Sequence, residues 1–225
     1  MNVLLSKYNF HEDWIRDELK EYINDDSKVV ILPFAFSEKW IFNAEQWDRA
    51  YSRQYGKFNS EIEEPFLSFG VKEENIIWLN YYKDSSKEMI DYINNSDILF
   101  FTGGLPEKAV ERILEIGLLD TLKKYNKLVI GASAGAMVQL TEYYISPDED
   151  YDFFNYYKGL GLINTDFHIE VHYTETKVQM ECISKVLKEK TKKIYAIGEK
   201  GGVILKDNLI KVYGEVTLFG DNLSG

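Results

Sequence analysis

The segment that decides the fold is residues 127–140, which read Lys-Leu-Val-Ile-Gly-Ala-Ser-Ala-Gly-Ala-Met-Val-Gln-Leu. Its first four residues are typical of a buried β-strand, and the small residues from position 134 onward indicate the start of a helix. Between them stands Gly-x-Ser-x-Gly, with the serine at position 133. This pattern is typical of a nucleophile elbow, in which a sharp strand-to-helix turn exposes the serine hydroxyl. The same pattern also fits a tightly packed turn or a phosphate-binding turn. Residues elsewhere in the chain therefore have to decide whether Ser133 is catalytic.

Apolar runs and amphipathic patterns alternate before this segment. The alternation predicts an α/β fold with a parallel sheet and helices on its faces, and the length of 225 residues suits a single domain over 1–225. Further strands are expected at 3–5, 29–33, 76–79, 98–101, 167–173, 194–197, 203–205, 210–213 and 216–219. Helices are expected at 13–23, 42–55, 62–69, 87–94, 134–140 and 176–188.

A second strand-to-helix junction lies at residues 102–107, Thr-Gly-Gly-Leu-Pro-Glu. Two glycines follow the strand at 98–101, and the proline suits the first turn of a helix. Because parallel strands end at one edge of a sheet, this junction is expected beside the elbow. Gly103 and Gly104 are then candidates for backbone N–H groups that stabilise an oxyanion.

A serine hydroxyl needs a nearby base and an acid that orients that base. The chain has three histidines, of which His11 lies before the first helix. Residues 167–173 alternate, which predicts His168, Glu170 and His172 on one face of a strand. The residues favour His172 over His168 as the base only by a small margin. Candidate acids are Asp148, Glu149, Asp150 and Glu170.

The same strand face allows a reading from another class of enzyme. His168, Glu170 and His172 could hold Zn²⁺ or Fe²⁺ as a site of two histidines and one carboxylate, which would make the protein a metal-dependent hydrolase. That reading leaves the elbow without a role.

The aromatic and acidic residues at 141–158 predict a short strand followed by a folded excursion that could act as a lid.

Composition narrows the classes of partner. Lys and Arg total 26 against 37 Asp and Glu, for a net charge of −11, so nucleic-acid binding is not expected. The apolar runs are too short to span a membrane, and the start of the chain has no signal-peptide pattern, so we expect a soluble, cytoplasmic protein. Cys182 is the only cysteine, and its apolar position in a helical pattern predicts a buried structural thiol.

Three segments together resemble the peptidase E family, the aspartyl dipeptidases or S51 family of serine peptidases. They are residues 128–136, 101–104 and 169–174, and the likeness extends to 31–35 and 197–199. The resemblance implies a three-layer α/β/α fold with a mostly parallel central sheet, similar to class I glutamine amidotransferases and flavodoxin-like proteins. Those amidotransferases carry cysteine at the elbow, where this chain has Ser133. An α/β-hydrolase would usually place its acid and histidine further downstream than here.

The resemblance also implies roles for individual residues. The nucleophile falls on Ser133, the general base on His172, and the acid on Asp148, with Glu149 as the alternative acid. The oxyanion donors would be the N–H groups of Gly104 and Ala134. Substrate binding falls on Gly103 and on Lys177, which stands where the family has an arginine that recognises aspartate. Lysine lacks the bidentate fork of arginine, which weakens the expectation of an N-terminal aspartate.

The sequence therefore predicts a serine peptidase that hydrolyses short peptides through an acyl-enzyme, without metal or cofactor. It would be dipeptidase-like, with an acidic N-terminal residue as one option for the substrate. The alternatives are a cyanophycinase-like hydrolase and a catalytically silent binding module of the same fold. The expected partner is a small peptide, with neither nucleic acid nor membrane, and a homodimer is left open.

Overall fold

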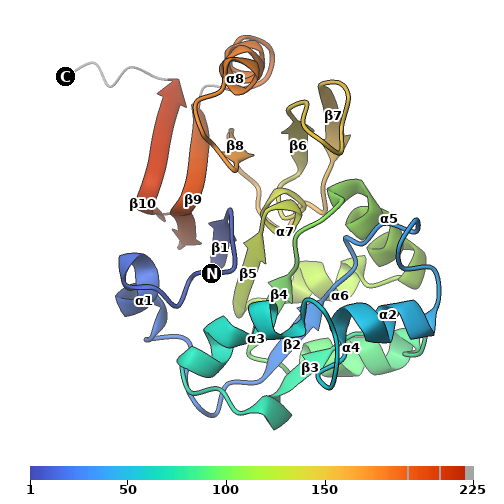
Figure 1. Ribbon diagram of the computed structural model, residues 1–225. Helices are drawn as coiled ribbons and strands as arrows, with labels where there is room; N and C mark the ends of the chain where they lie inside the picture. Colours follow the sequence, from blue (N-terminus) through green and yellow to red (C-terminus); the bar gives the residue numbers. More distant parts are fainter. Residues whose placement is uncertain (192, 208, 221–225) are drawn as a thin grey trace.

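The fold is described from a computed structural model of the chain, for residues 1–191, 193–207 and 209–220. Its centre is an eight-stranded sheet in the order β10-β9-β1-β5-β4-β2-β3, with β8 paired to β9 (Figure 1). A separate two-stranded sheet consists of β6 and β7. The strands of the large sheet are β1 (Asn2–Leu5), β2 (Val29–Leu32), β3 (Ile76–Trp78), β4 (Ile98–Phe101), β5 (Leu128–Ala132), β8 (Phe167–Val171), β9 (Lys193–Lys206) and β10 (Leu209–Gly220).

Five neighbouring strands, β1, β5, β4, β2 and β3, are parallel, as the alternating pattern predicts. β9 runs antiparallel to both β1 and β10, while its first half pairs with β8 in parallel. The α/β class with a mostly parallel sheet is confirmed.

The prediction of four short strands after residue 193 is wrong, because β9 and β10 are each continuous. Gly201 and Gly202 resemble a turn in the sequence, yet both lie inside β9. A Cβ on Gly201 would lie 2.3 Å from the carbonyl oxygen of Glu215, and one on Gly202 would lie 2.8 Å from the Leu5 side chain. These glycines therefore allow close packing of neighbouring strands. β10 is one strand whose register shifts between Gly214 and Val216.

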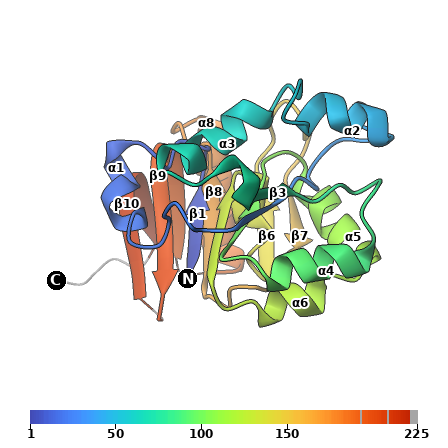
Figure 2. The same ribbon diagram turned by 90° about the horizontal axis from the view of Figure 1, so that it is seen from below.

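Helices cover both faces of the sheet, which gives the three layers that the resemblance implies (Figure 2). One buried cluster joins α1 and α3 to the sheet, and a second joins α4, α5, α6 and α7 to the opposite face. The helices are α1 (Asp13–Leu19), α2 (Ala44–Tyr51), α3 (Asn59–Ser68), α4 (Ser86–Asn94), α5 (Pro106–Ile116), α6 (Leu119–Lys124), α7 (Ala134–Met137) and α8 (Lys177–Glu189), with a 3₁₀ turn at Glu73–Asn75.

All six predicted helices are present, and α1, α2 and α7 are shorter than expected. Ser85 caps α4 in a reciprocal capping box with Glu88, and Pro106 begins α5, as the sequence indicates. In α8 Cys182 is buried, as its position predicts, together with Ile183 and Val186. The apolar pattern also points Val178 inward, but that residue is exposed. None of the described helices has the length and hydropathy of a membrane-spanning segment.

The aromatic segment after the elbow helix forms a hairpin of β6 (Glu142–Ile145) and β7 (Asn155–Lys158). The expected short strand is therefore present. Tyr143 and Tyr144 on β6 are buried, and Tyr144 packs in one cluster with α8 and the start of β9. The hairpin and α8 thus stand together at one end of the sheet, above the carboxyl ends of β5 and β8 (Figure 1).

Candidate active site

Ser133 sits at the turn between β5 and α7 with φ 54° and ψ −120°, a conformation that is strained for a residue with a side chain. Its N–H donates to the carbonyl oxygen of Leu5 at 2.9 Å. A Cβ on Gly131 would lie 2.0 Å from the Gly135 carbonyl oxygen, and one on Gly135 would lie 2.0 Å from the Phe101 carbonyl oxygen. The two glycines are therefore required for the turn to form, and the predicted elbow geometry is confirmed.

The second junction lies beside the elbow because β4 and β5 are parallel neighbours. Gly104 has φ 127°, and a Cβ there would lie 2.2 Å from the Ala35 carbonyl oxygen. Gly103 donates its N–H to the Tyr8 hydroxyl at 2.8 Å, so it is already engaged. Within the described chain, the N–H groups of Gly104 and Ala134 have no hydrogen-bond acceptor. Both residues line the same cavity as Ser133, so these two donors are available to an oxyanion.

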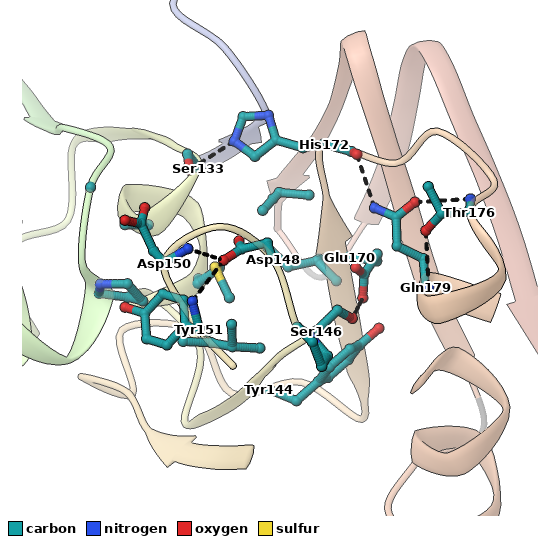
Figure 3. Close-up of a pocket in the computed structure, with 18 residues that line it drawn as sticks. Ser133, Tyr144, Ser146, Asp148, Asp150, Tyr151, Glu170, His172, Thr176 and Gln179 are labelled. Atoms are coloured by element: carbon teal, nitrogen blue, oxygen red, sulfur yellow. Dashed lines mark hydrogen bonds between the residues drawn. The ribbon is translucent and has the colours of Figure 1, made fainter. Parts of the chain in front are cut away.

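His172 places its Nε2 2.9 Å from the hydroxyl oxygen of Ser133, within the range of a nucleophile and its base (Figure 3). The histidine follows the last residue of β8 and has φ 53°, so the chain leaves the strand there. The prediction that His168, Glu170 and His172 share one strand face is therefore wrong for His172. His168 is buried under the β6 hairpin, beside the ring of Tyr144, and does not line the cavity with Ser133.

Two side chains from other elements hold the backbone of His172 in this conformation. The buried Ser6 hydroxyl, just after β1, accepts the His172 N–H at 3.0 Å and donates to the Ile197 carbonyl oxygen at 2.7 Å. Gln179 on α8 donates its side-chain amide to the His172 carbonyl oxygen at 2.9 Å. Its own side-chain oxygen accepts the N–H of Thr174 at 3.0 Å. The position of the imidazole is thus fixed from both sides of the strand end.

A cavity of about 390 Å³ opens above the serine and the histidine. Its walls come from the two strand-to-helix junctions, the β6 hairpin with its following loop, the end of β8 and the start of α8 (Figure 3). The residues that line it are Gly104, Pro106, Ser133, Ala134, Met137, Tyr144, Ile145, Ser146, Pro147, Asp148, Asp150, Tyr151, Ile169, Glu170, Val171, His172, Thr176 and Gln179.

The sequence model of peptidase family S51 matches residues 4–213, nearly the whole chain. The chain belongs to peptidase family S51. The match includes both junctions and the segment that carries His172, so the family assignment and the geometry concern the same residues. It confirms the family named from the sequence, which is a family of peptidases.

Two solved structures show the same fold. A candidate peptidase E protein from Listeria monocytogenes EGD-e is 19% identical, with a TM-score of 0.64 over 94% of this chain and 96% of that one. A peptidase from an acI-B1 actinobacterium is 17% identical, with a TM-score of 0.60 over 98% of this chain and 87% of that one. No curated protein matches the sequence.

The expected acids of this S51 member lie on the loop after β6. Asp148 lines the cavity, and its Oδ1 accepts the backbone N–H groups of Asp150 at 2.8 Å and Tyr151 at 3.0 Å. It has no hydrogen bond to His172 among the described contacts. Glu149 is exposed and does not line the cavity. Asp148 therefore shapes this loop and adds negative charge near the histidine.

Glu199 is a carboxylate near His172 that the sequence reasoning missed. β8 and β9 pair in parallel with Val171 opposite Ile197, and the Tyr173 N–H donates to the Ile197 carbonyl oxygen at 3.0 Å. The two strands thus bring residue 199 beside His172. Its carboxylate pairs with Lys7, with 2.6 Å between Nζ and Oε1. A polar residue just past a predicted strand was the available signal, but the pairing of that strand with β8 was not predicted.

The charges around His172 oppose each other. Partial desolvation against the cavity wall lowers the pKa of His172, and the positive charge of Lys7 lowers it further. Glu199 raises the pKa of His172, and Asp148 raises it to a lesser extent. The net shift is downward, so the imidazole is neutral at neutral pH and can accept a proton from Ser133.

Glu170 lies on the wall of the cavity, only 6% exposed. The Ser146 hydroxyl donates to its Oε2 at 2.9 Å. Burial raises the pKa of the Glu170 carboxyl to about 7. Glu170, His168 and His172 are not gathered into a ligand set, and no group of three potential ligands among the described residues could hold a metal ion.

Lys177 is 90% exposed at the start of α8 and lies 3.7 Å from Glu181, measured between Nζ and Oε1. It does not line the cavity. Of the two substrate-binding residues that the resemblance implies, Gly103 thus lies beside Ser133 and Lys177 faces solvent. A Cβ on Gly103 would come within 3.3 Å of the Ser133 Cβ, so the glycine keeps the approach to the serine open.

Proposed function

We propose that this S51 member is a serine-type peptidase that hydrolyses short peptides, with Ser133 as nucleophile and His172 as general base. One observation carries the proposal. The serine at a strained elbow points into a cavity and lies 2.9 Å from the imidazole Nε2 of His172. A nucleophile in hydrogen-bond contact with a base is the arrangement that acyl transfer requires.

The reaction follows from these positions. The Ser133 oxygen attacks the carbonyl carbon of the peptide bond while its proton passes to Nε2 of His172. The backbone N–H groups of Gly104 and Ala134 stabilise the negative oxygen of the tetrahedral intermediate. The imidazolium then gives its proton to the leaving amine as the C–N bond breaks, which leaves an acyl-enzyme. Water, activated by the same histidine, releases the acid product and restores the serine.

Two carboxylates compete for the role of the acid that orients His172. Asp148 is the acid that the family resemblance implies. Glu199 acts more strongly on the pKa of His172 and is not tied into a turn of its own. Substitution of the true triad acid by its amide should lower kcat by about 10²- to 10⁴-fold. Asp148→Asn and Glu199→Gln therefore give opposite results under the two assignments.

The size and cover of the cavity support a short substrate. The loop over 146–154 borders the cavity through Asp148, Asp150 and Tyr151. Tyr151 is anchored to α5, because its hydroxyl donates to Glu107 at 2.6 Å. A cavity of about 390 Å³ holds a dipeptide more readily than an extended chain. We therefore propose dipeptidase-like activity, whose cleaved bond and chain-length limit have to be measured.

A dipeptide library tests the proposal, with wild type and Ser133→Ala compared in the presence and absence of EDTA. Cleavage that resists EDTA and disappears in Ser133→Ala is the expected result. Cleavage that persists in Ser133→Ala would refute the serine mechanism. No cleavage, together with no labelling of Ser133 by a small phosphonate, would support the alternative of a silent binding module.

A further inference from the structure

The wall of the cavity contains a buried carboxyl group that the peptidase mechanism does not use. Glu170 is 6% exposed, and Ser146 provides the one hydrogen bond of ordinary geometry that its carboxylate makes among the described contacts. No lysine or arginine is paired with it in the described structure. Burying an ionised carboxylate without a neighbouring cation costs free energy. An unpaired carboxyl group in the wall of a cavity therefore favours a cationic ligand.

A second buried polar group faces the same part of the cavity. Tyr144 is 1% exposed, and its hydroxyl has no hydrogen-bond partner within the described chain. The ring lies beside Ser146 and Glu170, on the wall that the β6 hairpin contributes (Figure 3). A phenol oxygen can accept a hydrogen bond as well as donate one. Tyr144 and Glu170 therefore place two buried oxygen atoms on one part of the wall, and Ser146 provides the only hydrogen bond of ordinary geometry to this pair within the described chain.

The remaining charges of the cavity wall have the same sign. Asp148 and Asp150 line it with Glu170, and the described lining contains no lysine or arginine. Lys177, which resemblance suggests for binding an acidic side chain, faces solvent and pairs with Glu181. An acidic substrate side chain would thus meet only carboxylates here, and a cationic one would be attracted.

We propose that Glu170 and Tyr144 form a subsite that binds a cationic group of the substrate, an ammonium or a guanidinium, while Ser133 attacks a neighbouring carbonyl. This rests on the proposed function and specifies its substrate class. Glu170 precedes His172 by two residues, and both line the same cavity. Because β8 carries the subsite and leads directly into the base, the cation would set the position of the scissile bond relative to the imidazole.

The ionisation of Glu170 agrees with this assignment. Burial raises the pKa of its carboxyl to about 7, which is the behaviour of a carboxylate without a cation. The other titratable groups that are coupled to it are Tyr144, Asp148, Tyr173 and Cys182, and none of them is a cation. A bound ammonium would supply the missing charge and keep the carboxylate ionised.

Matched dipeptides test the subsite on the wild-type protein. Lys and Arg are compared with the neutral isostere norleucine and with Asp, at either position beside Ala and with free or acetylated N-termini. A charged hydrogen bond should raise kcat/KM for the cationic member by about ten- to hundredfold over its neutral counterpart. A preference for Lys over norleucine assigns the side chain, and dependence on a free N-terminus assigns the α-ammonium. Equal rates throughout, or a preference for Asp, would overturn the proposal.

The Glu170→Gln variant tests whether this residue is the cause. The ratio of kcat/KM for Lys and norleucine peptides should fall to about one, and this ratio, not the absolute rate, is the measured quantity. Asp152→Asn is the matched control, because Asp152 is an exposed carboxylate of the same loop that does not line the cavity. It should retain the full ratio. A preference for the Lys peptide that persists in Glu170→Gln would argue against the subsite. The same conclusion would follow if Asp152→Asn removed the preference to the same extent.

A binding measurement tests the subsite independently of the proposed peptidase activity. Calorimetric titration of Ser133→Ala with Lys- and norleucine-containing dipeptides needs no turnover. Tighter binding of the Lys peptide that is lost on adding Glu170→Gln supports the subsite even if no peptide is ever cleaved. Cleavage by the wild type together with equal binding of both peptides retains the peptidase and rejects the subsite.

Discussion

The hydroxyl of Ser6 is predicted to control activity without touching the substrate, and Ser6→Ala tests this. It accepts the His172 N–H at 3.0 Å and donates to the Ile197 carbonyl oxygen at 2.7 Å. His172 has φ 53°, a region that costs a residue with a Cβ about 1–2 kcal/mol. Two side-chain contacts oppose relaxation of this backbone, and Ser6 supplies one of them while Gln179 supplies the other.

The size of the effect follows from what each partner retains. The Ile197 carbonyl still accepts the Tyr173 N–H at 3.0 Å, so it keeps one hydrogen bond in the variant. The His172 N–H loses its acceptor. We therefore expect a loss of stability of about 1–2 kcal/mol, which for a chain of this size is roughly 2–8 °C in Tm. Displacement of the imidazole by a fraction of an ångström to one ångström should lower kcat by about ten- to hundredfold.

Ser96→Ala is the matched control for this substitution. Ser96 is also a buried serine, 1% exposed, and its hydroxyl donates to the Ile93 carbonyl oxygen at 2.9 Å. It lies just before β4, at the edge of the sheet opposite the cavity. Both variants should lose similar stability in thermal unfolding, and only Ser6→Ala should lose kcat in peptide hydrolysis. If Ser6→Ala kept its activity within twofold of Ser96→Ala, Ser6 would have no role in positioning the base.

Three further predictions concern the same site. Lys7→Gln removes a positive charge that lowers the pKa of His172, so this pKa should rise. In the wild type the acidic limb of the pH profile of kcat/KM is expected below the ordinary histidine pKa of about 6.5. In the variant this limb should move to higher pH. Lys177→Ala should change kcat/KM for Asp-containing dipeptides by less than about twofold, since the Lys177 side chain is 90% exposed and pairs with the exposed Glu181. A large loss of kcat/KM would show that Lys177 does bind the substrate. Gly135→Ala should cost about 3 kcal/mol in urea unfolding, because its Cβ would lie 2.0 Å from the Phe101 carbonyl oxygen, and a variant as stable as wild type would contradict the packing described for the elbow.

Features that depend on neighbouring residues could be predicted from the sequence. The elbow is one, since the two glycines and the strand before them lie within a few positions of Ser133. The parallel sheet is another, because alternation of strands and helices leaves few topologies. The position of Gly104 beside Ser133 followed from these two.

Features that depend on contacts between distant segments could not be predicted in this way. Gly201 and Gly202 resemble a turn, and only the approach of Glu215 and Leu5 shows why a strand needs them. The alternating pattern of 167–173 predicts one face for His168, Glu170 and His172, but Ser6 and Gln179 hold His172 outside that pattern. The burial of Glu170 likewise depends on the β6 hairpin and α8.

The end of β1 connects the proposed nucleophile, Ser133, to the proposed base, His172. Ser133 donates its N–H to the Leu5 carbonyl oxygen, and His172 donates its N–H to the hydroxyl of Ser6. Ser133 and His172 both have positive φ, and they are anchored to consecutive residues, the last residue of β1 and the residue after it. The 2.9 Å contact between Ser133 and His172 is therefore set by β1, β5 and β8 within the sheet. The loop over 146–154 forms only one wall of the cavity, so changes in that loop should alter which peptides bind before they alter the attack itself.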